Sequence, residues 1–110
     1  MVYYKIMDTF SALAEPRRRA IIELIAQKGS LSATDIADQF NISAPAISQH
    51  LKVLREAKLL DVERRHQMRI YTINTSSLQE IERWIGKINK MWNEKFDRLD
   101  KVLEDLKNGK

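Results

Sequence analysis

The sequence predicts a mainly α-helical chain that carries one small β-hairpin and ends in a long helix. Up to about residue 58, apolar residues recur every three or four positions, the spacing of helices that bury one face. Between residues 60 and 73 the pattern alternates and β-branched residues gather, which is typical of paired strands. From residue 78 to about residue 107 helical spacing returns, without a proline. The expected order of elements is therefore α-α-α-α-β-β-α.

The composition fits one globular domain. A chain of 110 residues is expected to form a single domain over 1–110. The chain has no cysteine, which excludes disulfides and thiolate metal sites. It has no apolar run of about 18 residues, and its start, MVYYKIMDTF, does not resemble a signal peptide. We expect a cytoplasmic protein that does not insert into a membrane.

The first two helices are delimited by the residues at their ends. Apolar residues at helical spacing predict a short helix over 4–14. A second helix begins at Glu15-Pro16, because proline is tolerated in a first turn. It ends at Gly29, because glycine commonly follows the last helical turn.

Two further helices follow, joined by a tight turn. Residues 32–40 form the third helix, with Ser32 as its N-cap. Asn41-Ile42 makes the turn, since asparagine tolerates the left-handed backbone conformation. Ser43 then caps a fourth helix that runs to about Lys58.

The third and fourth helices have the spacing of a helix-turn-helix, which places its second helix in the DNA major groove. Small Ala37 stands where the two helices cross closely, and Phe40, Ile42, Ile47 and Leu51 stand where apolar residues lock them together. A hairpin follows, with strands near 60–65 and 68–73 and a polar tip at His66-Gln67. A helix-turn-helix over 32–58 with a wing over 60–73 makes a winged helix-turn-helix.

Geometry then selects the side chains that reach DNA. If Ile47, Leu51 and Leu54 face inward, the groove face of the recognition helix carries Ala44, Pro45, Ser48, Gln49 and Lys52. Ser43 and the free N–H groups at the start of the helix suit a phosphate. Gln49 is suited to bidentate pairing with adenine, and Lys52 to a phosphate. On the wing, the residues expected to reach the backbone or the minor groove are Arg64, Arg65, Gln67 and Arg69.

His50 lies between the buried stripe and the groove face of the same helix. Three roles stay open from the sequence: a DNA contact, a packed side chain and a metal ligand. We include it among the DNA-binding residues. A metal site would need several converging ligands, and the only other histidine, His66, is at the wing tip. We expect no bound metal and no cofactor.

The charge distribution points to the same region. The chain carries a net charge of +4. Residues 43–72 hold six Lys or Arg against three Asp or Glu, and Arg17, Arg18 and Arg19 form a second basic cluster. A localised basic excess is typical of a phosphate-binding surface, although a solvated charged face gives the same pattern.

The last helix predicts a dimer. About 30 residues at 1.5 Å each span roughly 45 Å, more than one small domain covers. We expect part of this helix, 78–107, to pack on the N-terminal helix and the rest to pair with a second copy. The residues predicted at the dimer interface are Phe10, Leu78, Ile81, Ile85, Ile88, Trp92 and Leu99.

Three segments resemble the ArsR family of prokaryotic winged-helix repressors. FSALAEPRRRAIIELI (10–25) resembles the opening helices, SAPAISQHLKVLREAKLL (43–60) the recognition helix, and RRHQMRIYTIN (64–74) the wing. The resemblance implies a homodimer that binds a palindromic operator in double-stranded DNA and blocks access to the promoter.

This sequence also departs from that family's metal sensors. The helix before the turn reads SATDIADQF, without the cysteines of those sensors, and the last helix has no histidine. The position after the recognition helix, where the family usually has glycine, is Lys58. The sequence is more similar to the metal-independent branch, which includes autorepressors that a membrane or protein anti-repressor releases.

We therefore predict a sequence-specific DNA-binding transcriptional repressor that acts as a homodimer without responding to metal. Two alternatives remain: a winged-helix module that binds proteins, and a repressor that responds to a small ligand or to a metal held by oxygen and nitrogen atoms. Enzymatic activity is not expected, because no acid, base and nucleophile converge. Ser48 and His50 are two residues apart on one helix and do not face each other.

Overall fold

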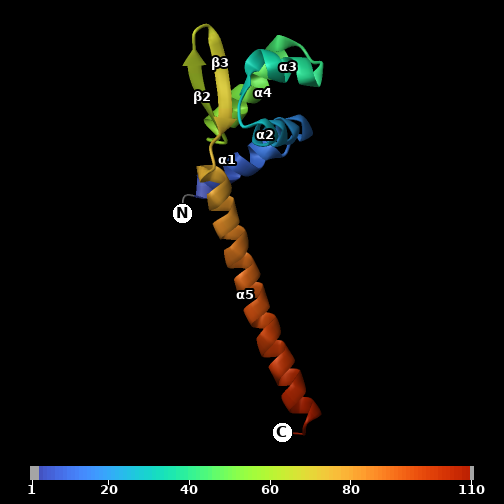
Figure 1. Cartoon of the computed structure of the whole chain (residues 1–110). Helices are drawn as coiled ribbons and strands as arrows, with labels where there is room; N and C mark the ends of the chain where they lie inside the picture. The colour runs from blue at the N-terminus through green and yellow to red at the C-terminus, as the bar shows by residue number, and fades with distance from the viewer. Residues whose placement is uncertain (1–2, 110) are drawn as a thin grey trace. The chain divides into compact units, whose positions relative to one another are not determined.

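The computed structural model describes residues 3–109 (Figure 1). The elements are α1 Tyr3–Leu13, α2 Pro16–Lys28, β1 Leu31–Ser32, α3 Ala33–Phe40, α4 Ala44–Glu56, β2 Leu60–Arg65, β3 Met68–Ile73 and α5 Ser76–Lys107. The chain divides into two compact units, residues 1–80 and residues 81–110. The first unit contains α1 to β3 and the first residues of α5, and the second contains the rest of α5.

The structure confirms the fold class and corrects the order of elements at one point. The two wing strands have the bounds that the alternating pattern predicted. The predicted order lacked β1, which pairs antiparallel with β3 through Leu31↔Tyr71 and Ser32↔Ile70. The sheet order is β1-β3-β2. A strand of two residues is too short to establish an alternating pattern, so the sequence contained no signal for it.

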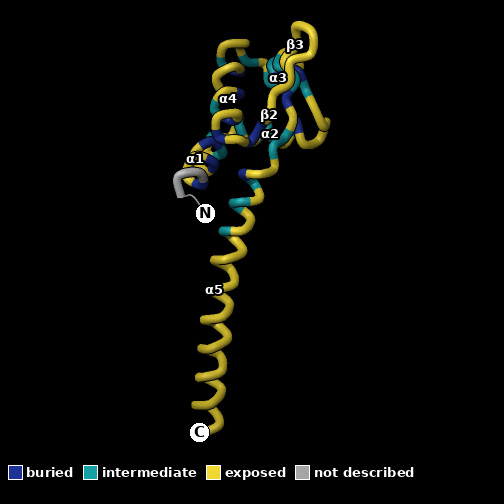
Figure 2. Tube along the Cα trace, turned by 90° about the vertical axis from the view of Figure 1, so that its left-hand side faces the viewer, coloured by how far each residue is buried: buried dark blue, intermediate teal, exposed yellow. Residues whose placement is uncertain are grey.

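The core of the first unit combines four helices with the base of the hairpin, and α1 contributes Ala12 to it. Ile21 and Ile25 of α2, Ile36 of α3, and Leu51 and Leu54 of α4 are almost completely buried. Leu59, Leu60 and Tyr71 join them from the end of α4 and the wing. In Figure 2 the buried positions gather in this unit. The core therefore holds α4 and the wing on one scaffold.

The predicted caps of α2, α3 and α4 are confirmed, whereas α1 covers Tyr3–Leu13 and not 4–14, α4 ends at Glu56 and not near Lys58, and α5 begins at Ser76 and not at 78. Glu15 caps α2, with Pro16 in its first turn and Gly29 as its C-cap residue. Ser32 and Ser43 cap α3 and α4 by accepting hydrogen bonds from the backbone N–H groups of Asp35 and Ala46. These caps satisfy N–H groups that a helix leaves without an internal partner.

The end of α4 is closed by a Schellman motif. Leu59 N–H donates to the carbonyl of Leu54 over 2.9 Å, and Lys58 N–H donates to the carbonyl of Arg55 over 3.0 Å. Lys58 adopts a left-handed conformation with φ of 60°. This is the position where glycine was expected by resemblance, so the lysine adopts a backbone conformation that costs least for glycine.

In the second unit α5 continues as a helix to Lys107, and every described side chain from Ile85 onward is exposed (Figure 2). Its large apolar side chains include Trp92 and Phe96, whose rings meet edge to face with centroids 5.0 Å apart. Trp92 is 60% exposed and Leu106 is 68% exposed. Among residues 3–109, no helix combines the length and hydropathy needed to cross a membrane.

Candidate nucleic-acid interface

The turn between α3 and α4 is built as the sequence predicts. Asn41 has φ of 50°, and its N–H donates to the carbonyl of Ala37 over 3.1 Å. Phe40 and Ile42 are half-buried against the core. Ile47 is buried on the inner face of α4. The turn and this apolar stripe fix the direction in which α4 presents its other face.

That other face is exposed at every residue predicted to face the groove. The set comprises Ala44, Pro45, Ser48, Gln49 and Lys52, and the predicted phosphate contact Ser43 at the start of α4 is exposed as well. The Ser43 hydroxyl accepts from Ala46 N–H over 3.3 Å, so it already caps the helix. The face therefore has the accessibility and the polar groups that contact with DNA requires, while the contact itself stays a prediction.

The wing presents its arginines on opposite faces of the hairpin. Arg64 stands opposite Arg69 in the strand register, two residues along each strand from the Val62↔Tyr71 pair. Two residues paired across neighbouring strands point to the same face of the sheet, and every second residue along one strand points to that face. Arg64 and Arg69 therefore share the face of the buried Tyr71. Arg65 lies on the other face, where its Nη2 is 3.2 Å from Glu63 Oε2.

Arg69 closes a small concavity beside the recognition helix. Ser48, Lys52 and Arg55 line it from α4, and Arg69 and Tyr71 line it from β3. Three cations thus surround one hollow, an arrangement suited to an anionic phosphate. Arg55 was not among the predicted contacts. The signal was its position three residues after Lys52, which places both on one helix face.

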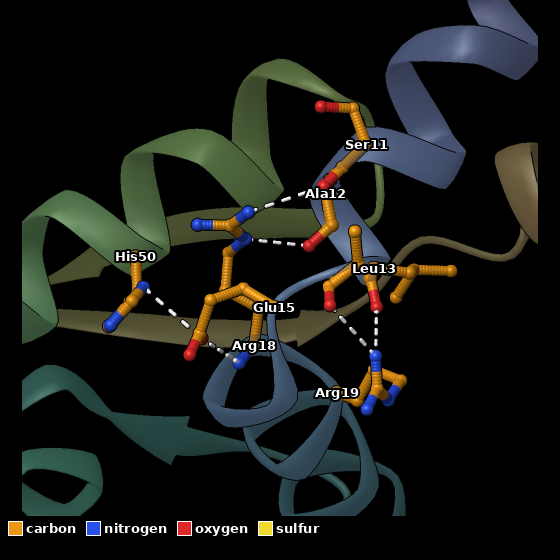
Figure 3. Close-up of polar contacts among 8 residues, drawn as sticks. Ser11, Ala12, Leu13, Glu15, Arg18, Arg19 and His50 are labelled. Atoms are coloured by element: carbon orange, nitrogen blue, oxygen red, sulfur yellow. Dashed lines mark hydrogen bonds and ion pairs between the residues drawn. The ribbon is translucent and has the colours of Figure 1, made fainter.

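His50 is turned away from that exposed face. Its side chain is 17% exposed, and its Nδ1 atom lies 3.9 Å from Glu15 Oε2. Nδ1 is buried and has no hydrogen-bond partner. Figure 3 shows this nitrogen directed toward Glu15 and the other ring nitrogen directed away from it. Of the roles left open by the sequence, this placement favours a packed side chain over a DNA contact.

Two of the three clustered arginines cap α1. Arg18 donates from Nε to the carbonyl of Ala12 over 2.6 Å and from Nη2 to that of Ser11 over 3.2 Å. Arg19 donates from Nη1 to the carbonyls of Leu13 and Ala14. These carbonyls lie in the last turn of α1 and directly after it, where a helix lacks internal donors. Two of the three arginines at 17–19 therefore stabilise the end of α1.

The predicted dimer residues fall into two groups. In the first unit, Leu78 packs against the core of its own chain, and Phe10 is 40% exposed. In the second unit Ile81 is half-buried, and four residues are exposed: Ile85, Ile88, Trp92 and Leu99. Leu78 therefore contributes to the monomer, while these four offer an apolar surface.

No three potential ligands among His, Asp and Glu converge anywhere in residues 3–109 in a way that could hold a metal ion. The carboxylates of α5, which the sequence places among lysines, are exposed from Glu82 onward.

Comparison with known proteins identifies the same region. A helix-turn-helix domain family matches residues 13–63. The transcriptional repressor SdpR of Bacillus subtilis is 40% identical over 84 residues, which cover 76% of this chain and 92% of that protein. The arsenical resistance operon repressor of Escherichia coli is 28% identical over 101 residues, covering 91% of this chain and 83% of the repressor.

Solved structures agree with the fold. A possible transcriptional regulator for arsenical resistance has a TM-score of 0.65 at 32% identity, covering 84% of this chain and 92% of that one. An ArsR-like transcriptional regulator from Rhodococcus sp. RHA1 has a TM-score of 0.80 at 21% identity, covering 91% and 93% of the two chains. The second match supports the fold alone.

Proposed function

Because the chain belongs to the ArsR family of DNA-binding winged helix-turn-helix repressors, we propose that it represses transcription as a homodimer bound to a palindromic operator. The observation that carries the proposal is the exposed polar face of α4, backed by buried Ile47, Leu51 and Leu54. A rigid helix that presents polar groups on one side is suited to reading base edges in the major groove. Action on an operator places the protein in the cytoplasm.

Base recognition is assigned to Gln49 and Ser48, and phosphate contact to Lys52, Arg55, Arg64 and Arg69. Gln49 can offer adenine a donor and an acceptor at once. The cations around the hollow between α4 and β3 attract phosphate without regard to sequence. Base reading and phosphate binding therefore come from different parts of one surface.

Dimerisation is assigned to the apolar residues of α5. Ile85, Ile88, Trp92 and Leu99 are each more than two-fifths exposed. A run of large apolar side chains on one helix is stabilised when it is removed from water, and a second copy supplies a matching surface. A dimer also matches the two-fold symmetry of a palindromic site.

Metal is not proposed as the inducer. The chain has no cysteine and its last helix has no histidine, so it lacks the thiolate ligands and the last-helix imidazole ligands that the family's metal sensors use. Similarity to the metal-independent branch of the family supports release by a protein anti-repressor. Unchanged operator affinity on addition of zinc or of EDTA is the expected result.

The test is a mobility-shift assay with the DNA upstream of the protein's own gene, compared with a scrambled fragment. We expect specific binding that weakens steeply as salt increases. Gln49→Ala should relax base preference, because it removes a bidentate reader, whereas Lys52→Ala should weaken binding to both fragments. Full affinity and preference in Gln49→Ala would contradict the assignment of base recognition. No shift at low salt would favour a module that binds proteins.

A further inference from the structure

A polar cluster connects the recognition helix to the turn between α1 and α2. It consists of Glu15, Arg18 and His50 together with the carbonyls of Ser11 and Ala12, and we refer to it as the polar joint (Figure 3). Arg18 binds both carbonyls at the end of α1 through its guanidinium group. None of these groups lies on the predicted groove face of α4.

Glu15 occupies the centre of the polar joint. Its Oε2 atom accepts a 3.1 Å hydrogen bond from the backbone N–H of Arg18, which caps α2. The same oxygen lies 3.9 Å from His50 Nδ1. The carboxylate of Glu15 therefore contacts the start of α2 and faces the side chain of His50 in α4. Because Arg18 also binds α1, three helices meet at these two residues.

The buried position of His50 Nδ1 favours a hydrogen-bond partner for this nitrogen. This nitrogen is buried without a hydrogen bond, and a buried polar atom left unpaired is unfavourable. The Oε2 atom of Glu15 is an acceptor 3.9 Å from it, about 1 Å beyond ordinary hydrogen-bond length. A small approach of α4 to α2 satisfies the nitrogen with a charge-assisted bond, which is stronger than a bond between neutral groups.

We propose that His50 is a positioning residue, which holds the recognition helix through Glu15 and does not itself contact DNA. Gln49 and Lys52, which lie on the predicted groove face of α4, are one and two residues away from His50 along the chain. Side chains that bind a partner must be held closely by their supports, so the register of these two residues on DNA depends on the contact beneath them. This inference rests on the proposed operator binding.

Two conservative variants separate the two ring nitrogens of His50. In His50→Asn the side-chain amide takes the place of Nδ1, whereas in His50→Gln it reaches the place of Nε2. We expect His50→Asn to keep operator affinity within about threefold, and His50→Gln and His50→Ala to lose on the order of tenfold, the value of one hydrogen bond to a charged group. The reverse pattern, with glutamine active and asparagine inactive, would indicate a DNA contact through Nε2 and overturn the proposal.

A double-mutant cycle tests whether the effect passes through Glu15. Glu15→Gln combined with His50→Gln should bind operator no more weakly than the weaker single variant, because each removes the same contact. Glu15→Gln also disturbs the cap of α2, so Ser32→Ala, which removes the cap of α3, serves as the matched control. Ser32→Ala should add its loss to that of His50→Gln. Additive losses for Glu15 and His50 would contradict the polar joint.

A measurement without DNA keeps the inference separate from the proposed function. The ¹⁵N resonances of the His50 ring report which nitrogen carries a proton. We expect a protonated Nδ1 in the wild-type protein and a shift toward protonated Nε2 in Glu15→Gln. An identical spectrum in both proteins would overturn the proposal. Failure of the wild-type protein to bind any DNA would instead overturn the proposed function.

Discussion

The hydroxyl of Ser77 donates a 2.9 Å hydrogen bond to the backbone carbonyl of Ala57, and Ser77 is almost completely buried. This bond joins the first turn of α5 to the residue that ends α4. Both residues belong to the first unit, and the entire wing, from Leu60 to Ile73, lies between them in the sequence. The end of the recognition helix is thereby fixed from both sides, by the wing strand and by the helix that follows the wing.

Ser77→Ala should lower the free energy of unfolding by about 1–3 kcal/mol, because the Ala57 carbonyl is left buried without this donor. Ser76→Ala is the matched control, since the Ser76 hydroxyl bonds the side chain of Asn74 at an exposed position. It should cost less than about 0.5 kcal/mol. Urea unfolding monitored by circular dichroism measures both, and equal losses would contradict the importance of the buried bond.

Lys58→Gly should stabilise the protein by about 1 kcal/mol, because the left-handed conformation at this position penalises a side chain. Lys58→Ala is the control: it removes the same charge but keeps a Cβ atom, so it should give no comparable gain. Chemical denaturation provides the comparison. If alanine stabilises as much as glycine, the effect comes from charge and not from backbone conformation.

Arg69→Ala should weaken binding to specific and scrambled DNA alike and reduce the salt slope by about one, as expected for one lost phosphate contact. Arg69 lines the cationic hollow beside α4. Arg65→Ala should have a smaller effect, since Arg65 lies on the other face of the wing and pairs with Glu63. Mobility shifts at several salt concentrations would decide, and a larger effect at Arg65 would assign the DNA side of the wing to the opposite face.

Trp92→Glu should convert the proposed dimer to a monomer at micromolar concentration without unfolding the first unit, because it puts a charge on the apolar surface of α5. Lys90→Glu also introduces a glutamate, on a different side of the helix, and changes the net charge by two units instead of one; it should nevertheless leave the dimer intact. Sedimentation velocity distinguishes the two. A wild-type monomer at this concentration would contradict the dimer assignment.

Local patterns in the sequence were sufficient to predict the five helices, the wing and the exposed face of α4. Residue types with narrow conformational preferences mark the boundaries: Pro16, Gly29, Ser32, Asn41 and Ser43 each stand where the structure begins or ends a helix. Apolar spacing then divided α4 into a buried side and an exposed side, because side-chain direction in a helix follows from position alone. The family resemblance rests on these same segments.

The relationships between distant segments could not be predicted in this way, because they depend on how the elements pack. Strand β1 exists because Leu31 and Ser32 meet β3, about forty residues later in the chain. Spacing left His50 between two faces, and the role proposed for it follows from the nearby Glu15, the N-cap residue of α2. Arg65 differs from Arg69 through the strand register, and Arg18 caps a helix that precedes it. Such contacts depend on which elements pack together, and a local pattern of residue types carries no information about a partner that is distant in sequence.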